Sequence, residues 1–353
     1  MAWFPTDPHS VTPAWLSHVL GADVRACRLE QIGIGIGILA RVFRVHLDGT
    51  GVPDSVVVKL PSLDEKAFAL CADLDFYLCE AHFYQDVGVA NPLRPARPYF
   101  TAFDPVTHDF VLVLEDLGHL RVNDQIGGCS AEDAEVIVDA IAGHHAYWWE
   151  SERFASMTWL KQFEDPRYAD VIAANFEAAW PVVLDQFGDE LSPSIRAFGQ
   201  RFPALVAWYA SEIACPPATF LHGDLRLDQF FFAVEPSDPP VTALDWQLSS
   251  IGRGAYDLAY FLSQSLATDT RRSCEEDLIA RYAERLSERG IDYAADELNR
   301  DCRLTTAWCF AYPVIGTGRI EPANDRQVDL LRAMLRGSVA AIEDHDALAL
   351  RPD

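Results

Sequence analysis

The stretch HGDLRLDQ at residues 222–229, followed by LDWQ at residues 244–247, decides how the rest of the chain is interpreted. It places two aspartates, Asp224 and Asp245, in separate segments of the chain. Phosphoryl transfer needs a hydroxyl held in line with a phosphate, and cations that neutralise the phosphates. A loop carboxylate can accept the hydroxyl proton, and a carboxylate at a strand end can hold Mg²⁺, which prefers oxygen ligands. Either motif alone would equally fit a turn or a strand end, whereas both together favour this chemistry.

The elements expected around these motifs change in kind along the chain. Short apolar runs in the N-terminal third predict strands at 26–32, 39–47, 54–60, 98–103 and 109–115. Helical spacing predicts helices after Thr12 and at 64–87, 130–150, 171–187, 193–214, 256–268, 274–289, 294–311 and 325–344, with short strands at 229–233 and 241–245. This order predicts an α+β fold with two lobes, 1–117 and 118–353, and a hinge at 116–120.

Three segments together resemble a known superfamily of kinases. LHGDLRLDQFFF at 221–232, VTALDWQ at 241–247 and GRGAYDLAYFL at 252–262 are similar to the aminoglycoside phosphotransferase/choline kinase superfamily, in particular to its ecdysteroid-kinase-like branch and related bacterial proteins. The resemblance implies a bilobal protein-kinase-like fold, with a small β-rich N-lobe that binds nucleotide and a larger helical C-lobe for catalysis and acceptor binding. It also implies ATP and Mg²⁺ as cofactors and a small-molecule hydroxyl as acceptor, aminoglycoside-, choline-, sugar- or steroid-like.

The same resemblance assigns roles to residues of these motifs. Asp224 would be the catalytic base, and His222 of the same motif is counted with it among the catalytic residues. Asp245 would be the principal Mg²⁺ ligand. Asp257, in the YDLA of the third segment, would be the buried helix aspartate that braces the catalytic loop.

Gln229 departs from the superfamily pattern, which has Asn as the second metal ligand at this position. The extra methylene moves the amide oxygen by more than about 1 Å, an error that octahedral Mg²⁺ tolerates poorly. Three outcomes follow: Gln229 still ligates, Asp228 or water replaces it, or catalysis is impaired. The alternative function is therefore a pseudokinase, which binds nucleotide or ligand with little turnover.

The glycines of GIGIG, Gly33, Gly35 and Gly37, lie between two predicted strands, as in a hairpin that covers phosphates. Glycine allows the backbone to approach a ligand closely. A Rossmann fingerprint is the competing interpretation, but it requires a helix directly after the glycines. Residues 40–47 instead alternate like a strand, so the hairpin is favoured.

Lys59 ends the apolar run VVVK and matches the superfamily's strand lysine, which contacts the α- and β-phosphates. A lysine that points to solvent at a strand end is the alternative. Glu80, in the predicted helical segment, is the expected partner that fixes Lys59, with Glu65 and Asp75 as weaker candidates.

The run VLVLEDL at 111–117 resembles the last N-lobe strand and the hinge. By that resemblance, backbone groups of Glu115 and Leu117 read the adenine. The acidic side chains of Glu115 and Asp116 are expected in solvent. No chemistry is assigned to the following segment, 123–125.

Two further groups favour packing over chemistry. His144 and His145 lack the i, i+4 spacing of a helical metal pair, so they are expected in the core or in a pocket wall. Trp308, Phe310 and Tyr312 lie where the superfamily builds its acceptor pocket, and ordinary helical packing explains them equally well.

The composition of the chain excludes some classes of binding partner and predicts the cellular compartment. The net charge of −25 at pH 7 argues against nucleic acid and against an anionic membrane, because both need a basic surface. The eight cysteines are scattered with no C-x-x-C, which indicates reduced, mostly buried thiols in a cytoplasmic protein. The N-terminus lacks the features of a signal peptide, and no apolar run is long enough to span a membrane.

Overall fold

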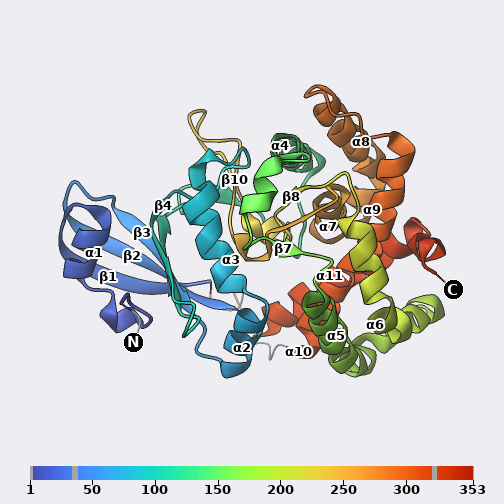
Figure 1. Ribbon diagram of the computed structural model, residues 1–353, viewed down its shortest axis with the longest axis horizontal. Helices are drawn as coiled ribbons and strands as arrows, with labels where there is room; N and C mark the ends of the chain where they lie inside the picture. The colour runs from blue at the N-terminus through green and yellow to red at the C-terminus, as the bar shows by residue number, and fades with distance from the viewer. Residues whose placement is uncertain (1–2, 34–38, 320–323, 353) are drawn as a thin grey trace. The chain divides into compact units, whose positions relative to one another are not determined.

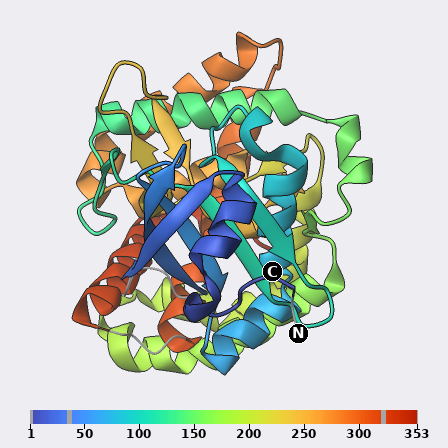
Figure 2. The ribbon, with the colours of Figure 1, turned by 90° about the vertical axis from the view of Figure 1, so that its left-hand side faces the viewer.

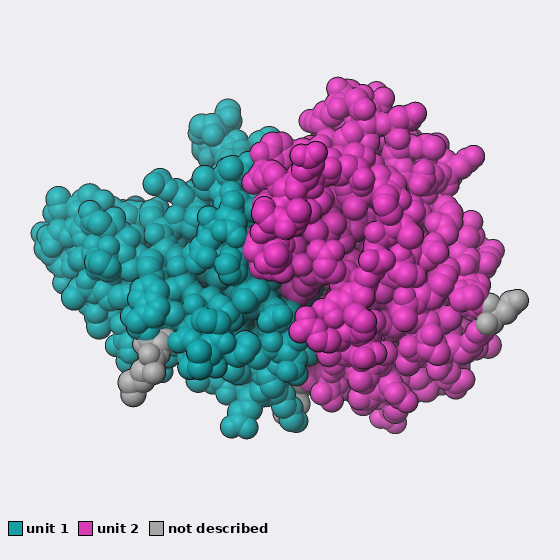
Figure 3. Space-filling view, in the orientation of Figure 1, with its two compact units in different colours: residues 1–121, 231–248 teal, residues 122–230, 249–353 magenta. Residues whose placement is uncertain are grey.

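The computed structural model describes residues 3–33, 39–319 and 324–352, and the chain forms two compact units (Figures 1 and 3). The first unit comprises residues 1–121 and 231–248, and the second comprises residues 122–230 and 249–353. A five-stranded sheet lies in the first unit, whereas the second is mainly helical. The predicted α+β fold, with a β-rich N-terminal region and a helical C-terminal region, is confirmed.

The sheet of the first unit is antiparallel, with strand order β1-β2-β3-β5-β4. Its strands are β1 (Asp23–Ile32), β2 (Ala40–Thr50), β3 (Ser55–Pro61), β4 (Pro98–Phe103) and β5 (Phe110–Glu115). All five overlap the strands that the apolar runs predict. The pairing of β1 with β2 also confirms that the glycine segment connects neighbouring antiparallel strands.

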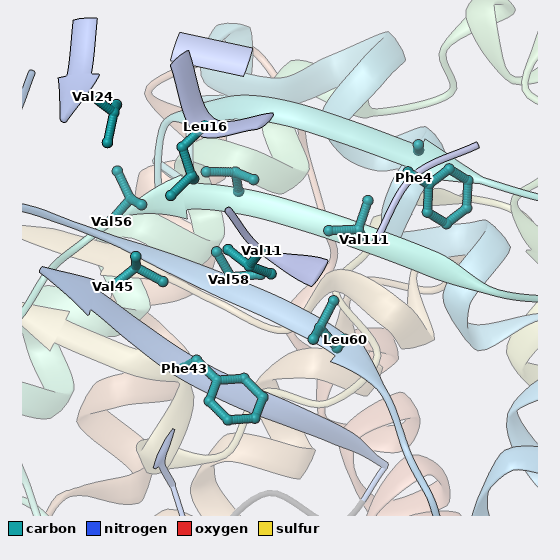
Figure 4. Close-up of a cluster of buried hydrophobic side chains, with 12 residues drawn as sticks. Phe4, Val11, Leu16, Val24, Phe43, Val45, Val56, Val58, Leu60 and Val111 are labelled. Carbon is teal, nitrogen blue, oxygen red and sulfur yellow. The ribbon is translucent and has the colours of Figure 1, made fainter. Parts of the chain in front are cut away.

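Helix α1 (Pro13–Leu20) covers one face of this sheet (Figures 1 and 2). Thr12 caps its first turn by accepting the Trp15 N–H, and Gly21 ends it in the left-handed conformation, with φ of 63°. Leu16 is fully buried in a cluster of apolar side chains (Figure 4). The helix therefore adds an apolar layer to this side of the sheet.

The alternation of side chains along β3 separates this core from a polar face. Val58 and Leu60 are fully buried in the cluster around α1. Successive side chains of a strand point to opposite faces, so Lys59 between them faces the other side. The side chain of Lys59 meets Glu80 of helix α3 (Phe76–His82) there.

The helical segment predicted at 64–87 is helical in the structure, but it is divided into separate helices. Helix α2 (Glu65–Asp73) ends before Leu74, and α3 begins after Asp75. Asp75 adopts φ of 54°, a left-handed conformation that a continuous right-handed helix cannot contain. A π-helical turn at Phe83–Val87 then follows α3.

Residues 231–248 were expected in the second lobe, but they form part of the first compact unit. They contain most of β9 (Phe230–Phe232) and all of β10 (Val241–Ala243), in a small sheet of order β10-β9-β6, where β6 is Arg121–Val122. Ala243 donates its N–H to the Arg94 carbonyl, and the ring of Trp246 stacks on Phe83 at 4.0 Å. These contacts join the segment to the region around α3 and explain the difference.

The second unit consists mainly of helices, and most of them match predicted ones. Its helices are α4 (Ala131–Trp148), α5 (Pro166–Phe187), α6 (Pro193–Ala214), α7 (Ala255–Ser265), α8 (Thr268–Ser287), α9 (Ala295–Cys309), α10 (Ala311–Arg319) and α11 (Asp325–Asp344). A small sheet of order β7-β11-β8 accompanies them, formed by β7 (Lys161–Gln162), β8 (Thr219–Leu221) and β11 (Ser250–Gly252).

The helix predicted at 294–311 is broken at Phe310, and α10 continues beyond it. Pro313 lacks the N–H that would bond to the Cys309 carbonyl in a continuous helix, which accounts for the break.

The structure bears on two expectations from composition. All eight cysteines are free, and most of them are buried. In the described ranges, no helix combines the length and the apolar character that a membrane crossing requires.

We predict that Leu60→Ala destabilises the protein by about 2–5 kcal/mol, because it opens a cavity in the buried apolar cluster on this face of the sheet. Leu63→Ala is the matched control, since Leu63 is 74% exposed and its loss should change stability by no more than about 0.5 kcal/mol. Denaturant unfolding measures both. Equal effects of the two substitutions would contradict the assignment of Leu60 to the core.

Candidate active site

Lys59, Glu80 and Asp245 form one cluster within the first unit. The Lys59 ammonium donates to both carboxylate oxygens of Glu80, at 2.9 and 2.7 Å, and also to Asp245 Oδ1. Lys59 and Glu80 are almost completely buried, while the Asp245 side chain is 28% exposed. Among the candidates for the lysine partner, Glu80 is the one that the structure brings into contact, and the solvent-facing alternative for Lys59 is excluded.

The charge of this cluster follows from its surroundings. Burial by itself lowers the pKa of Lys59, but the carboxylates of Asp245 and Glu80 more than offset it, so the pKa lies above its ordinary value. The ammonium is therefore charged at all physiological pH values. Two carboxylates around one ammonium leave a net negative charge on the cluster, which favours the approach of a further cation.

Asp245 has an unusual backbone conformation. Its φ is 63°, in the left-handed region that non-glycine residues rarely adopt. Such residues persist where the surrounding structure holds them, and they concentrate at functional sites. Asp245 follows the end of β10 by two residues, and with this backbone conformation its carboxylate contacts Lys59.

The hinge residues differ from expectation in their side chains. Glu115 accepts from Arg94 at 2.8 Å, and Asp116 accepts from Arg44 at 2.6 Å and from the Ser55 hydroxyl at 2.6 Å. The expectation that both acidic side chains lie free in solvent is therefore wrong. Arginine neutralises each carboxylate, and these bonds fix the chain where the hinge begins.

Some backbone groups of the hinge already form hydrogen bonds within the protein. Glu115 donates its N–H to the Arg97 carbonyl at 2.8 Å, and Leu117, which is buried, accepts from the Leu120 N–H at 2.9 Å. Adenine recognition by backbone groups of Glu115 and Leu117 stays a prediction. In the glycine segment, Gly33 has φ of 69°, a value that favours glycine, whereas Gly35 and Gly37 lie outside the described residues.

The HGD loop carries a second cluster, which lies within the second unit. Asp224 Oδ1 accepts from Arg226 Nε at 2.9 Å and from the Tyr260 hydroxyl at 2.9 Å. Asp224 Oδ2 accepts from Gln229 Nε2 at 3.3 Å and from Arg226 Nη2 at 3.4 Å. The structure thus brings Asp224 and Gln229 together and adds Arg226 and Tyr260, to which the sequence analysis assigns no role.

The backbone of this loop is fixed by a buried carboxylate. Asp257 Oδ2 accepts the His222 N–H at 2.7 Å, and Oδ1 accepts the Gly223 N–H at 3.0 Å. Gly223 has φ of 88°, which requires glycine here, and it allows the chain to present both amides. The bracing role that the resemblance implies for Asp257 therefore has a direct structural basis.

His222 acts within the loop. It is fully buried, and its Nδ1 accepts the Asp224 N–H at 3.2 Å. Since a ring nitrogen that accepts carries no proton, the tautomer with hydrogen on Nε2 follows. This contact makes His222 a positioning residue for Asp224, and a direct catalytic role stays a prediction.

His145 extends the brace into the helical core. Its Nε2 lies 3.2 Å from Asp257 Oδ2, and its Nδ1 lies 2.8 Å from the Tyr282 hydroxyl. A carboxylate only accepts hydrogen bonds, so Nε2 donates to Asp257, and the neutral imidazole with its hydrogen on Nε2 satisfies both contacts by accepting the Tyr282 hydroxyl at Nδ1. The expectation that His144 and His145 are packed in the interior is confirmed by their full burial. The sequence does not indicate that His145 supports the HGD loop through Asp257.

Two further side chains hold the end of the loop. Gln125 Oε1 accepts the Asp228 N–H at 3.2 Å, while its Nε2 donates to the Gln264 carbonyl. Ser265 Oγ accepts the Leu227 N–H at 2.9 Å. Segment 123–125, to which no chemistry was assigned, thus supplies part of the support for the loop.

The late aromatic residues divide between packing and the surroundings of Asp224. Trp308 and Phe310 are fully buried and pack among other rings, which favours the packing interpretation. Tyr312 is half-buried, and its ring lies 5.1 Å from that of Tyr260, which bonds to Asp224. Of the three, Tyr312 is therefore the one whose ring contacts a residue bonded to Asp224.

Comparison with known proteins assigns the chain to a family. The profile of the ecdysteroid kinase-like family matches residues 37–292, which contain both clusters. The chain belongs to the ecdysteroid kinase-like family. No curated protein matches the chain in sequence.

Solved structures agree in fold with this member of the ecdysteroid kinase-like family. A Ralstonia eutropha protein to which aminoglycoside phosphotransferase activity has been attributed has 15% identity and a TM-score of 0.55, over 97% of this chain and 98% of its own. Choline kinase from Cryptosporidium parvum has 8% identity and a TM-score of 0.52, over 92% and 90%. Aminoglycoside 2'-phosphotransferase-IIIa in its GDP complex has 13% identity and a TM-score of 0.50, over 93% and 94%.

The match to the ecdysteroid kinase-like family ends at residue 292, before α9. Within the described residues, no group of three or more His, Cys, Asp or Glu side chains could hold a metal ion by itself. Asp245 and Gln229 nevertheless offer carboxylate and amide oxygens, the ligand types that Mg²⁺ shares with phosphates and water. That Asp224 and Asp245 act on one bound nucleotide stays a prediction.

We predict that Asp257→Asn costs about 2–4 kcal/mol of stability, because an amide cannot replace a buried carboxylate that accepts two backbone N–H groups. Hydrogen exchange at the amides of His222 and Gly223 should accelerate along with the loss of stability. Asp269→Asn is the control, because the Asp269 side chain is fully exposed. Its contact with Arg272, at 3.9 Å, is too long to contribute much to stability. Unchanged exchange at both amides would disprove the brace.

Proposed function

We propose that this protein is a small-molecule kinase that transfers the γ-phosphate of ATP to a hydroxyl group, with Mg²⁺ as cofactor. The observation that carries the proposal is the buried Lys59 ammonium, held between Glu80 and the carboxylate of Asp245. Kinases fix the phosphate-binding lysine with a glutamate from a neighbouring helix and hold Mg²⁺ with a separate aspartate, and Glu80 and Asp245 fit these two places. Membership of a kinase-like family supports the same reaction.

The proposed division of work follows the two clusters. Lys59 donates to the phosphates, and the glycine segment that includes Gly33, Gly35 and Gly37 covers them. Asp245 holds Mg²⁺ with its carboxylate, and Gln229 offers its amide oxygen. The metal would neutralise charge on the phosphates as they react.

Asp224 accepts the proton of the acceptor hydroxyl and orients it toward the phosphate. His222 and Asp257 keep the loop in place, so little reorganisation is needed when the acceptor arrives. In phosphoryl transfer, positioning and electrostatic stabilisation supply most of the rate. The acceptor is a small molecule of aminoglycoside-, choline-, sugar- or steroid-like type.

ATP is the proposed donor. The base would contact the hinge, where the Leu117 N–H serves as donor because the Glu115 N–H is committed to Arg97. The GDP complex of aminoglycoside 2'-phosphotransferase-IIIa supports nucleotide binding by a protein of this fold. GTP is therefore the competing donor to be tested beside ATP.

We predict that Asp224→Asn retains ATP binding but lowers kcat by about 10²- to 10⁴-fold, the range expected for loss of a general base. The measurement is an ATP-consumption screen over hydroxylated small molecules, with aminoglycosides, choline, sugars and steroids included. Purified Asp224→Asn serves as the blank. Wild-type turnover by this variant on the acceptor found would remove Asp224 from its role.

A second function, that of a pseudokinase, is favoured by one observation. Gln229 stands where the superfamily pattern has Asn as the second metal ligand, and its longer side chain displaces the amide oxygen that would bind Mg²⁺. In a pseudokinase the same clusters would bind nucleotide with little turnover.

The substitution Gln229→Asn separates the two functions. If the protein is a working kinase, we expect kcat to change by no more than a few-fold, because Gln229 already serves the metal. A gain of about 10- to 100-fold in Mg²⁺-dependent phosphotransfer would instead show that the native site is impaired. Steady-state kinetics over a range of Mg²⁺ concentrations provide the measurement.

A further inference from the structure

The carboxylate of Asp224 is surrounded by hydrogen-bond donors. Oδ1 receives Arg226 Nε and the Tyr260 hydroxyl, both at 2.9 Å. Oδ2 receives Gln229 Nε2 at 3.3 Å and Arg226 Nη2 at 3.4 Å. An ionised carboxylate offers about four lone-pair positions, two on each oxygen. All of these positions are therefore used, and two of them are used by a single side chain, Arg226.

The two oxygens are not held equally. Both bonds to Oδ1 are short, whereas both bonds to Oδ2 are long and weak. A hydroxyl that approaches Asp224 must displace one donor. The displaced donor will be one of the two on Oδ2, since the bonds on Oδ1 cost more to break.

Arg226 is built into the loop as a fixed cation. Its side chain is only 16% exposed, and Nη1 lies 3.7 Å from Asp228 Oδ2. Burial by itself lowers the pKa of Arg226, but Asp224, Tyr260 and Asp228 raise it above its ordinary value, so the group keeps its charge. Its backbone also belongs to the loop, because the Arg226 N–H donates to the Asp224 carbonyl at 2.9 Å. A planar guanidinium with several donors can hold one carboxylate oxygen while releasing the other.

We propose that Arg226 is a positioning residue for the transfer reaction. Its Nε holds Asp224 through Oδ1, and its Nη2 leaves Oδ2 when the acceptor hydroxyl binds there. The proposal rests on the proposed kinase function and adds a residue to it. Arg226 keeps the carboxylate in one orientation before the acceptor binds. When the hydroxyl displaces Nη2, the bond from Nε remains, so Asp224 does not rotate as it takes the proton. The acceptor O–H bond breaks and its proton goes to Oδ2 as the oxygen bonds to the γ-phosphorus. The bond from that phosphorus to the β–γ bridging oxygen of ATP breaks at the same time, and ADP leaves with that oxygen.

The test compares Arg226→Gln with Arg226→Lys. Gln keeps a single donor nitrogen but has no charge and no fork, while Lys keeps the charge on a single donor nitrogen. We expect Arg226→Gln to lower kcat by about 10- to 100-fold, with KM for Mg²⁺-ATP changed by no more than about twofold, because the defect lies in orientation of the base. Arg226→Lys should recover part of the loss. The readout is ADP formation from Mg²⁺-ATP, with the acceptor found in the screen and with water alone.

Arg281→Gln is the matched control. Arg281 is also a partly buried arginine of the second unit, and it binds Asp139 through Nε and Nη2 at 2.7 and 2.8 Å. Its removal should lower thermal stability about as much as Arg226→Gln does and leave kcat unchanged. The comparison separates a role in the reaction from a role in folding alone.

The outcomes are distinct. Wild-type kcat in folded Arg226→Gln overturns the positioning role while the kinase function stands. The same conclusion follows if activity falls equally in Arg226→Gln and Arg281→Gln, or if Arg226→Lys recovers nothing. Absence of ADP formation by the wild-type protein with every acceptor and with water overturns the kinase function, and the role of Arg226 with it.

Discussion

A buried ammonium group sets the main constraint on the first unit. Lys59 lies on the face of β3 opposite the apolar core, and a charge removed from water is tolerated only if opposite charges compensate it. Glu80 and Asp245 provide that compensation from segments far apart in sequence. One charge thus connects β3, α3 and the chain after β10, and it explains why residues 231–248 belong with the N-terminal sheet.

The second unit obeys a related constraint on backbone polarity. A loop that turns through Gly223 exposes amide groups that no helix or strand satisfies, and buried amides without partners are costly. Asp257 accepts two of them, His145 supports Asp257, and Tyr282 supports His145. The loop is consequently held by a chain of bonds that passes through α7, α4 and α8.

The sequence predicts most of this arrangement where local patterns determine it. The apolar run that ends in Lys59 and its match to the superfamily's strand lysine locate Lys59, and the HGD motif with the following YDLA locates Asp224 and Asp257. Other features depend on tertiary contacts that no local pattern records. The left-handed backbone of Asp245, the break before α3 and the bonds of Arg226 to Asp224 are of this kind. His145 could be recognised as buried, but its partner lies over a hundred residues away.

The bonds from Tyr282 to the loop have a consequence for the energetics of ligand capture. Because this polar chain is completed within a single unit by the protein's own side chains, the entropy of ordering the loop is lost during folding. A ligand that reaches the loop finds it already rigid, and its binding energy is not consumed by closing a mobile segment. Selectivity among acceptor alcohols would then depend more on how well each one fits a preformed surface than on conformational change induced by the ligand.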